Sequence, residues 1–206
     1  MPETGREQGF PRRALNNWGQ TQGLTQGFVE ELAAARIGAT FNQYAGSPLR
    51  RARLTAYLEA RRSAPILLVG EAAGYRGARV SGIPFTSERQ LTGAGPAEAT
   101  ATVVHRVLAE LGLEEDVLLW NLVPTHPHRP GDPGSNRPPT RDEIRAGARF
   151  VEALAAGRRV VPVGRLAHRA LGGDYVRHPA HGGAAAFRRS LLHFCAGGQA
   201  SATPLL

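Results

Sequence analysis

Residues 69–88 read VGEAAGYRGARVSGIPFTSE and concentrate groups that could do chemistry. They follow an apolar run and hold two carboxylates, Glu71 and Glu88, the rings of Tyr75 and Phe85, and four glycines. A carboxylate can orient water or stabilise a developing cation, and an aromatic ring can stack on a planar group. A plain surface connection would require none of these groups. The stretch therefore predicts the mouth of an active site.

A buried amide and an imidazole follow further along the chain. Asn121 interrupts the apolar run VLLWNLV over residues 117–123, in which Trp120 is predicted to be a core residue. An unpaired buried amide costs about 1–3 kcal/mol. Its donor and acceptor lie side by side, which suits the Watson–Crick edge of a nucleobase, although a strand-end amide can also bond its own loop. His178 opens the sequence HPAHGG and offers a ring N–H that can stabilise an anion.

The periodicity of apolar residues places these groups at the ends of strands. It predicts strands at residues 66–69, 116–124, 159–163 and 175–177, and helices at residues 24–36, 48–62, 96–113, 140–156, 165–171 and 183–194. The capping box TRDE at residues 140–143 marks one helix start. Alternating strands and helices form a parallel sheet whose ligands lie beyond the carboxyl ends of its strands. Glu71, Asn121 and His178 each lie at or just after such an end, so we expect them to meet.

The ordered motifs GEAAGY (70–75), PFTS (84–87), LWN (119–121) and HPAHGG (178–183) resemble those of the uracil-DNA glycosylase superfamily, in a bacterial branch without an iron–sulfur cluster. The resemblance covers residues 65–192. It implies an α/β fold, a three-layer α/β/α sandwich with a central four-stranded parallel sheet. It also implies removal of uracil from DNA by hydrolysis of the N-glycosidic bond, the first step of base excision repair.

The resemblance implies catalytic roles for an acid and a histidine. Glu71 would lie near the sugar C1′, orient water and stabilise an oxocarbenium-like state. Branches of the superfamily place this acid differently, and Glu88, three residues past Phe85, matches the second placement. Both glutamates are therefore candidates. His178 would bond O2 of the departing uracil, and a neutral imidazole suffices because the anion needs only a donor.

The same resemblance implies a uracil pocket. Phe85 would stack on the extruded base, Asn121 would read it, and Tyr75 would close the pocket where a thymine methyl would lie. The implied pocket residues are Gly70, Ala72, Tyr75, Phe85 and Asn121. Ala73 stands where related branches carry proline, which predicts a less rigid loop.

Contacts to DNA are expected from the histidine motif and from arginines. His181 and Gly182 precede a helix, whose first N–H groups favour phosphate. The Pro-rich loop over residues 125–139 would lie along DNA, unless it is a solvated connection. The expected DNA contacts are His181, Gly182, Arg188, Arg129 and Arg137. His126-x-His128 and His178-x-x-His181 have no acid or thiol in register, so no metal site is expected.

The composition narrows the chemistry further. The 206 residues carry a net charge of +8, which favours a polyanionic partner. All 25 Lys and Arg positions are arginine, so no lysine can form an imine with an abasic sugar. The single cysteine, Cys195, excludes an internal disulfide and a cluster held by several thiolates. No cofactor is expected.

These features predict one catalytic domain over residues 23–195, a flexible arm over residues 1–22 and a mobile tail over residues 196–206. No apolar run is long enough to span a bilayer, so we expect a cytoplasmic protein. We also expect it to be a nucleoid-associated monomer that acts on uracil-containing DNA. Two alternatives remain. The same fold could act on hypoxanthine, xanthine or mismatched thymine, or it could bind uracil-DNA without turnover.

Overall fold

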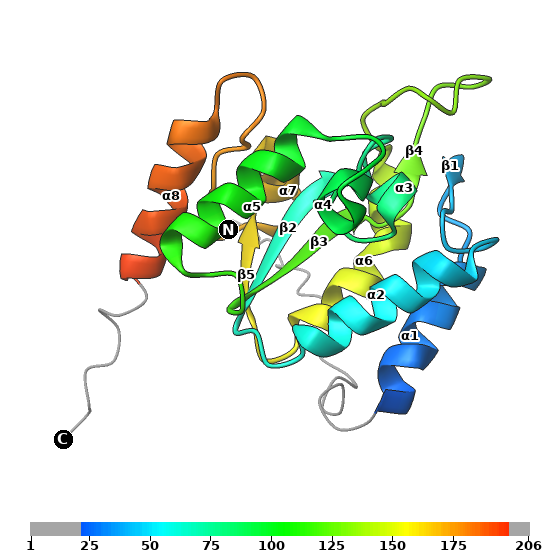
Figure 1. Ribbon diagram of the computed structural model, residues 1–206, viewed down its shortest axis with the longest axis horizontal. Coiled ribbons are helices and arrows are strands. Elements are labelled where there is room, and N and C mark those ends of the chain that lie inside the picture. The colour runs from blue at the N-terminus through cyan, green and yellow to red at the C-terminus, as the bar shows by residue number, and fades with distance from the viewer. Residues whose placement is uncertain (1–21, 198–206) are drawn as a thin grey trace, which may run out of the picture.

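The computed structural model describes residues 22–197, and the expectations for residues 1–21 and 198–206 lie outside them. A parallel sheet forms the centre, with β2 (Ile66–Ala72) between β3 (Val117–Val123) and β5 (Arg159–Pro162) (Figure 1). The predicted helices appear as α1 (Gln22–Ala34), α2 (Pro48–Ala60), α5 (Ala99–Leu111), α6 (Arg141–Ala155), α7 (Arg165–Leu171) and α8 (Ala184–Gly197). Helix α8 thus includes the first two residues of the predicted tail, 196 and 197.

The prediction of four strands is wrong, because the sheet has three. The segment predicted as the fourth strand contributes one parallel bridge, between Val163 and Val176. Val176 donates to the carbonyl of Pro162 at 3.1 Å and accepts from Gly164 N–H at 2.8 Å. Pro162 directly precedes Val163 of this bridge, and proline has no N–H with which to extend a ladder.

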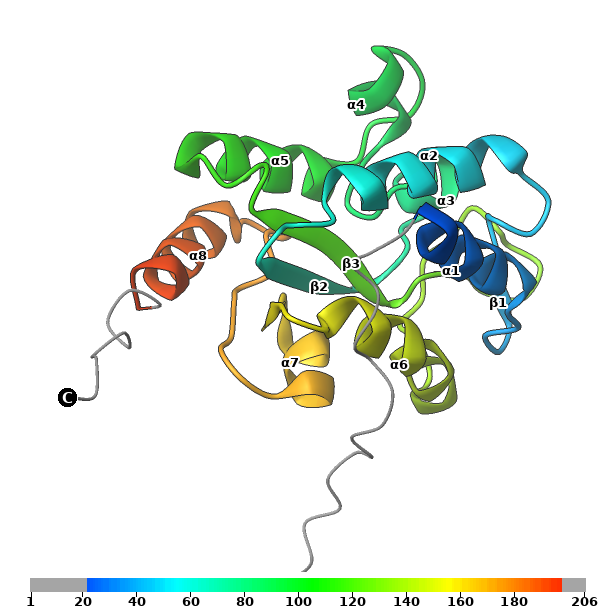
Figure 2. The same cartoon turned by 90° about the horizontal axis from the view of Figure 1, so that it is seen from below.

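Both faces of the sheet are covered by helices, which explains why its strands are apolar throughout (Figure 2). Alternate residues of β2 point to opposite sides. Leu67 and Val69 pack in a cluster with α1, α2 and α6, whereas Leu68 packs in a second cluster with α5 and α8. Within residues 22–197, no helix combines the length and apolar character needed to cross a membrane.

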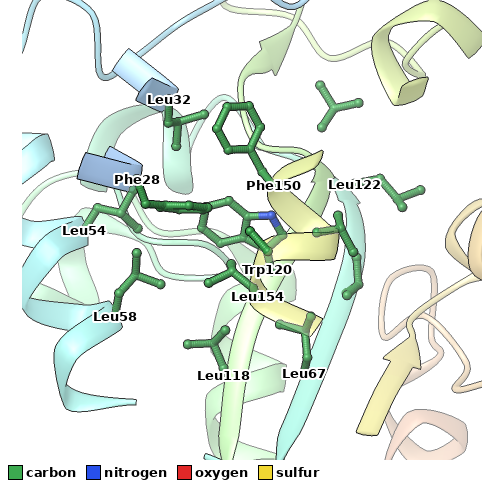
Figure 3. Packing of buried hydrophobic residues seen from close by; sticks show 14 of the residues in the cluster. Phe28, Leu32, Leu54, Leu58, Leu67, Leu118, Trp120, Leu122, Phe150 and Leu154 are labelled. Carbon is green, nitrogen blue, oxygen red and sulfur yellow. The ribbon is translucent and has the colours of Figure 1, made fainter. Parts of the chain in front are cut away.

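Trp120 lies fully buried in the first cluster, as predicted. Figure 3 shows it among leucines and phenylalanines from α1, α2 and α6. The ring centroids of Phe28 and Trp120 are 5.6 Å apart, and the ring of Phe28 meets that of Phe150 edge-on at 5.5 Å. This packing fixes β3, and with it the neighbouring Asn121.

Four short elements were not predicted: α3 (Ala78–Ser81), α4 (Glu88–Thr92), β1 (Thr40–Phe41) and β4 (His126–Pro127). Strands β1 and β4 pair antiparallel, and the hydroxyls of Thr40 and Thr125 share a hydrogen bond of 2.6 Å. The side-chain amide of Gln43 donates to the carbonyl of Pro124 at 2.8 Å. These contacts hold the chain that leaves β3, so the beginning of the Pro-rich loop is fixed rather than solvated.

The far end of that loop is held by an ion pair. Thr140 and Glu143 form the predicted capping box of α6. The Glu143 carboxylate, which is only 2% exposed, also accepts two hydrogen bonds from Arg137, one of them 2.8 Å long. The Arg137 guanidinium holds the pKa of Glu143 below its usual range.

We predict that Arg137→Gln lowers the free energy of unfolding by about 3–5 kcal/mol near neutral pH, because Glu143 would be left buried without its charge partner. Ionised Glu143 is stabilised in the folded protein, so this difference should shrink as the pH falls through the folded-state pKa of Glu143. Urea denaturation at several pH values measures it. Arg145→Gln, which breaks an exposed pair with Asp142, should change stability by less than about 0.5 kcal/mol. Equal effects of the two variants would contradict the prediction.

Candidate active site

One pocket of about 340 Å³ opens beyond the carboxyl ends of β2 and β3. Its wall combines residues from the loop after β2, the end of β3, the Pro-rich loop and the histidine motif. It thus brings together Glu71, Phe85, Asn121 and His178, which are far apart in the sequence. The full lining is Glu71, Ala72, Ala73, Gly74, Ala78, Phe85, Glu98, Thr100, Asn121, Pro127, Asn136, Arg137, His178 and His181.

The strand register places the floor of this pocket. In the parallel pairing of β2 with β3, Gly70 lies opposite Asn121. The Phe85 ring lies against Gly70 so closely that a Cβ there would overlap the ring, and the side-chain oxygen Oδ1 of Asn121 would be 3.1 Å from that Cβ. Glycine at position 70 therefore allows the Phe85 ring and the Asn121 amide to lie next to each other.

Phe85 has left-handed backbone, with φ of +53°, which is unusual for a bulky residue and must be held by its surroundings. Several hydrogen bonds hold the turn. Ser81 Oγ donates to the carbonyl of Thr86 at 2.6 Å, Tyr44 Oη donates to Gly82 at 3.1 Å, and Arg50 Nε donates to Val80 at 2.9 Å. Sequence reasoning missed Tyr44 and Arg50, because nothing local in the sequence connects them to a turn more than 30 residues away.

The two candidate acids have different surroundings. Glu71 is half-buried and lines the pocket. Burial raises the pKa of its carboxyl, and the positive charge of Arg169 offsets part of that rise. Glu88 lies outside the pocket lining at the start of α4, where Arg53 donates two hydrogen bonds of 2.8 and 2.9 Å to its carboxylate. Of the two candidates that the sequence left open, Glu71 lines the pocket and Glu88 does not. Glu88 instead ties the turn that presents Phe85 to α2.

His178 is held as a neutral donor. Its Nδ1 accepts a hydrogen bond from the backbone N–H of Ala180 at 3.1 Å, so the neutral ring carries its proton on Nε2. Burial lowers the pKa of His178, and the nearby Arg177 and His181 lower it further. His181 lines the same pocket, and His181 and Gly182 form a turn with φ values of +53° and +73°.

Several predicted contacts are not in place in this structure. Tyr75 does not line the pocket, and its ring instead carries the Arg76 guanidinium at 5.1 Å from the centroid. The predicted closure of the pocket by Tyr75 therefore rests on no contact in this structure. Arg188 pairs with Glu110 at 3.2 Å, whereas Arg129 is exposed on the Pro-rich loop.

Arg137 lines the pocket edge, but it is not available for a phosphate. Its guanidinium makes five hydrogen bonds: two to Glu143 and one each to the carbonyls of Ala39, His128 and Pro138. A guanidinium has five N–H donors, so none remains. Arg137 therefore holds the Pro-rich loop in place, and a phosphate contact from it would have to replace one of these five hydrogen bonds.

The loop at Ala73 is also better fixed than its missing proline predicts. The N–H of Ala73 donates to the carbonyl of Val123 at 3.2 Å, a bond that proline could not make. The Ala73 carbonyl shares a 2.8 Å hydrogen bond with Nδ1 of the buried His126. Alanine stands where proline was expected, and two hydrogen bonds of its backbone hold the loop in place of the rigid proline ring.

Two pocket residues were missed altogether. Asn136 Oδ1 accepts a hydrogen bond of 3.1 Å from the N–H of Tyr75, which joins the Pro-rich loop to the loop after β2. Glu98, at the N-cap of α5, adds a second half-buried carboxylate to the lining. Neither residue carries a sequence signal of its role, because both are surface-type residues in polar segments. Over residues 22–197, no group of three or more His, Cys, Asp or Glu side chains is arranged to hold a metal ion.

Comparisons with known proteins agree with this geometry. A family model described as the Uracil DNA glycosylase superfamily matches residues 58–199, more than half of the chain. The chain belongs to the uracil DNA glycosylase superfamily. Members of this superfamily are DNA glycosylases, hydrolases that act on DNA.

The fold of this superfamily member also resembles a solved structure. The crystal structure of wild-type Pedobacter heparinus SMUG2 matches with a TM-score of 0.60 and 12% sequence identity, over 85% of this chain and 97% of that chain. At that identity the likeness concerns the fold alone. No curated protein matches the sequence.

We predict that Gly70→Ala lowers glycosylase activity by about 100-fold, because the added Cβ must displace the Phe85 ring from its place beside Asn121. Single-turnover base release measures the effect, with a thermal melt to confirm that the variant is folded. Gly27→Ala is the matched control, since a Cβ there meets nothing within 4 Å. Wild-type activity in a folded Gly70→Ala protein would show that the place of the ring is not critical.

Proposed function

We propose that this protein is a uracil-DNA glycosylase, which hydrolyses the N-glycosidic bond of a uracil flipped out of DNA and leaves an abasic site. The observation that carries the proposal is the meeting of Glu71, Phe85, Asn121 and His178 around one pocket. Flipping is required because the glycosidic bond of a stacked base is out of reach of such a pocket.

In this proposal the base is held by a ring and an amide. Uracil stacks on Phe85, a contact worth about 1–3 kcal/mol. Asn121, whose side chain lies at the pocket floor and is 4% exposed, pairs with the Watson–Crick edge through its donor and acceptor. Because β3 is packed on both faces, the amide is rigidly placed and discriminates well between bases.

Glu71 serves the sugar side of the bond. As the bond to the base lengthens, positive charge develops at C1′, and a nearby carboxylate stabilises it and orients the attacking water. Within residues 22–197 Glu71 forms no direct ion pair, and the charge of Arg169 acts on it only from a distance. Burial raises its pKa, which means that the ionised carboxylate gains more than an exposed one from a cation placed beside it.

His178 serves the base side of the bond. The departing uracil carries negative charge on O2, and the Nε2–H of His178 can donate to it. The hydrogen bond from Ala180 fixes this tautomer before substrate arrives, so no proton transfer is needed. The lowered pKa keeps the ring neutral near pH 7.

The contact with DNA would come from the histidine turn and the exposed Arg129. His181 and Gly182 lie at the pocket rim, where their exposed turn can enter the gap left by the flipped nucleotide. Because the chain has no lysine, the product strand should stay intact after base release.

We predict that the purified protein releases uracil from a uracil-containing oligonucleotide, and that strand cleavage appears only after alkali. Glu71→Gln should lose at least about 100-fold in single-turnover rate, because it removes the charge opposite the cation. Glu88→Gln should lose no more than about 10-fold, through looser placement of the Phe85 turn.

Three oligonucleotides test the claim fully, with uracil opposite guanine, uracil opposite adenine, and uracil in a single strand. The absence of release from all three, beside a working control enzyme, would rule out the function. A greater loss in Glu88→Gln than in Glu71→Gln would exchange the roles of the two acids.

A further inference from the structure

His105 is a half-buried histidine for which the proposed reaction has no use. It lies on α5, whose buried residues Val104 and Leu108 share an apolar cluster with Phe85. Its Nε2 is 3.0 Å from Oγ1 of Thr86, the residue that follows Phe85. The side chain therefore connects α5 to the turn that presents the Phe85 ring to the pocket.

A second hydrogen bond of Thr86 shows which partner donates in this contact. Thr86 Oγ1 donates to the carbonyl of Pro84 at 3.1 Å, and a hydroxyl has only one hydrogen to give. The contact with His105 therefore needs an N–H on Nε2 of the ring. Burial lowers the pKa of His105, and a hydrogen bond to the carbonyl of Phe85 opposes that shift. The ring thus acts as a donor to both residues of the turn, Phe85 and Thr86.

The strained backbone of Phe85 is held from two helices. A bulky residue with φ of +53° relaxes to an ordinary conformation unless its neighbours prevent it. Tyr44 and Arg50, on the side of α2, bond carbonyls that precede Phe85 in the chain. His105, on the side of α5, bonds the residue that follows it. The ring therefore projects from a turn that is fixed before and after it.

A neighbouring contact joins the same segment to α5. Gln90 Oε1 accepts a hydrogen bond of 2.9 Å from the N–H of Ser87, and the Gln90 amide donates to the carbonyl of Ala101 at 3.3 Å. Ala101 is fully buried on α5, one turn before His105. The chain that follows Phe85 is thus joined to two successive turns of a helix that is packed against the sheet.

Resting on the proposed function, we propose that His105 is a positioning residue, whose ring N–H sets the angle at which Phe85 stacks on the base. His105 lies outside the pocket lining, so its effect on base release passes through Phe85. A rotation of the Phe85 ring would move the stacked base relative to Glu71 and His178. Misplacement of reacting groups by about 1 Å can cost about 100-fold in rate.

The test measures single-turnover release of uracil opposite guanine by His105→Leu and His105→Gln. Leucine fills similar space without an N–H, whereas glutamine carries an N–H close to the position of Nε2. His105→Leu should lose about 10-fold in rate, and His105→Gln should stay within about 3-fold of the wild type. His193→Leu, at an exposed position of α8, is the matched control and should leave the rate unchanged. Thermal melts establish that each variant is folded, and His105→Ala replaces His105→Leu if the leucine variant does not fold.

The same substitution in a Phe85→Ala protein separates positioning from a general effect on stability. Without the ring, His105→Leu should change the remaining rate by less than about 2-fold, because the two residues act as a unit. An equal loss in both backgrounds would overturn the inference and leave the proposed function standing. Equal rates in folded His105→Leu and His105→Gln proteins would do the same. No uracil release by the wild type would remove the proposed function and this inference together.

Discussion

The site depends on the register between β2 and β3. That register sets Gly70 opposite Asn121, and the missing side chain of the glycine is the space into which the Phe85 ring fits. A slip of one residue would turn Asn121 to the other face of the sheet and close the space beside it. The packing of Trp120 between the helices and the sheet resists such a slip, since its ring has no other place to be buried. The packing of the core thus determines the register of β2 and β3, and the register determines the geometry of the pocket.

Ion pairing separates structural acids from pocket acids in this arginine-rich chain. Glu88 and Glu143 each accept two hydrogen bonds from an arginine and hold a loop in place. Glu71 and Glu98, by contrast, are half-buried in the pocket and form no ion pair within residues 22–197. Leaving a carboxylate in that condition costs stability, which a protein tolerates where the charge has a use. The contrast was not visible in the sequence, which does not show which arginine each glutamate meets.

The sequence was most informative where local rules decide the outcome. The strand at residues 66–69, the apolar run around Asn121, the capping box at Thr140 and the burial of Trp120 follow from periodicity and capping, and the structure has them all. It was less informative where side-chain contacts or the extent of strand pairing decide the outcome. Arg137 was assigned to DNA because a surface arginine in a loop gives no sign of a buried partner six residues on. The fourth strand failed because apolar spacing does not reveal which prolines border the pairing. The sequence also did not show that Glu98 lines the pocket while Tyr75 does not, because the direction of a loop side chain depends on tertiary contacts.

The central claim is that a nucleobase binds between Phe85 and Asn121 with its sugar bond toward Glu71. A crystal structure of the Glu71→Gln protein with a uracil-containing duplex tests it most directly. Our account predicts an extruded uracil stacked on Phe85, its Watson–Crick edge within hydrogen-bonding distance of the Asn121 amide and its O2 within reach of His178 Nε2. A uracil still stacked in the duplex, or one bound away from Asn121, would contradict it.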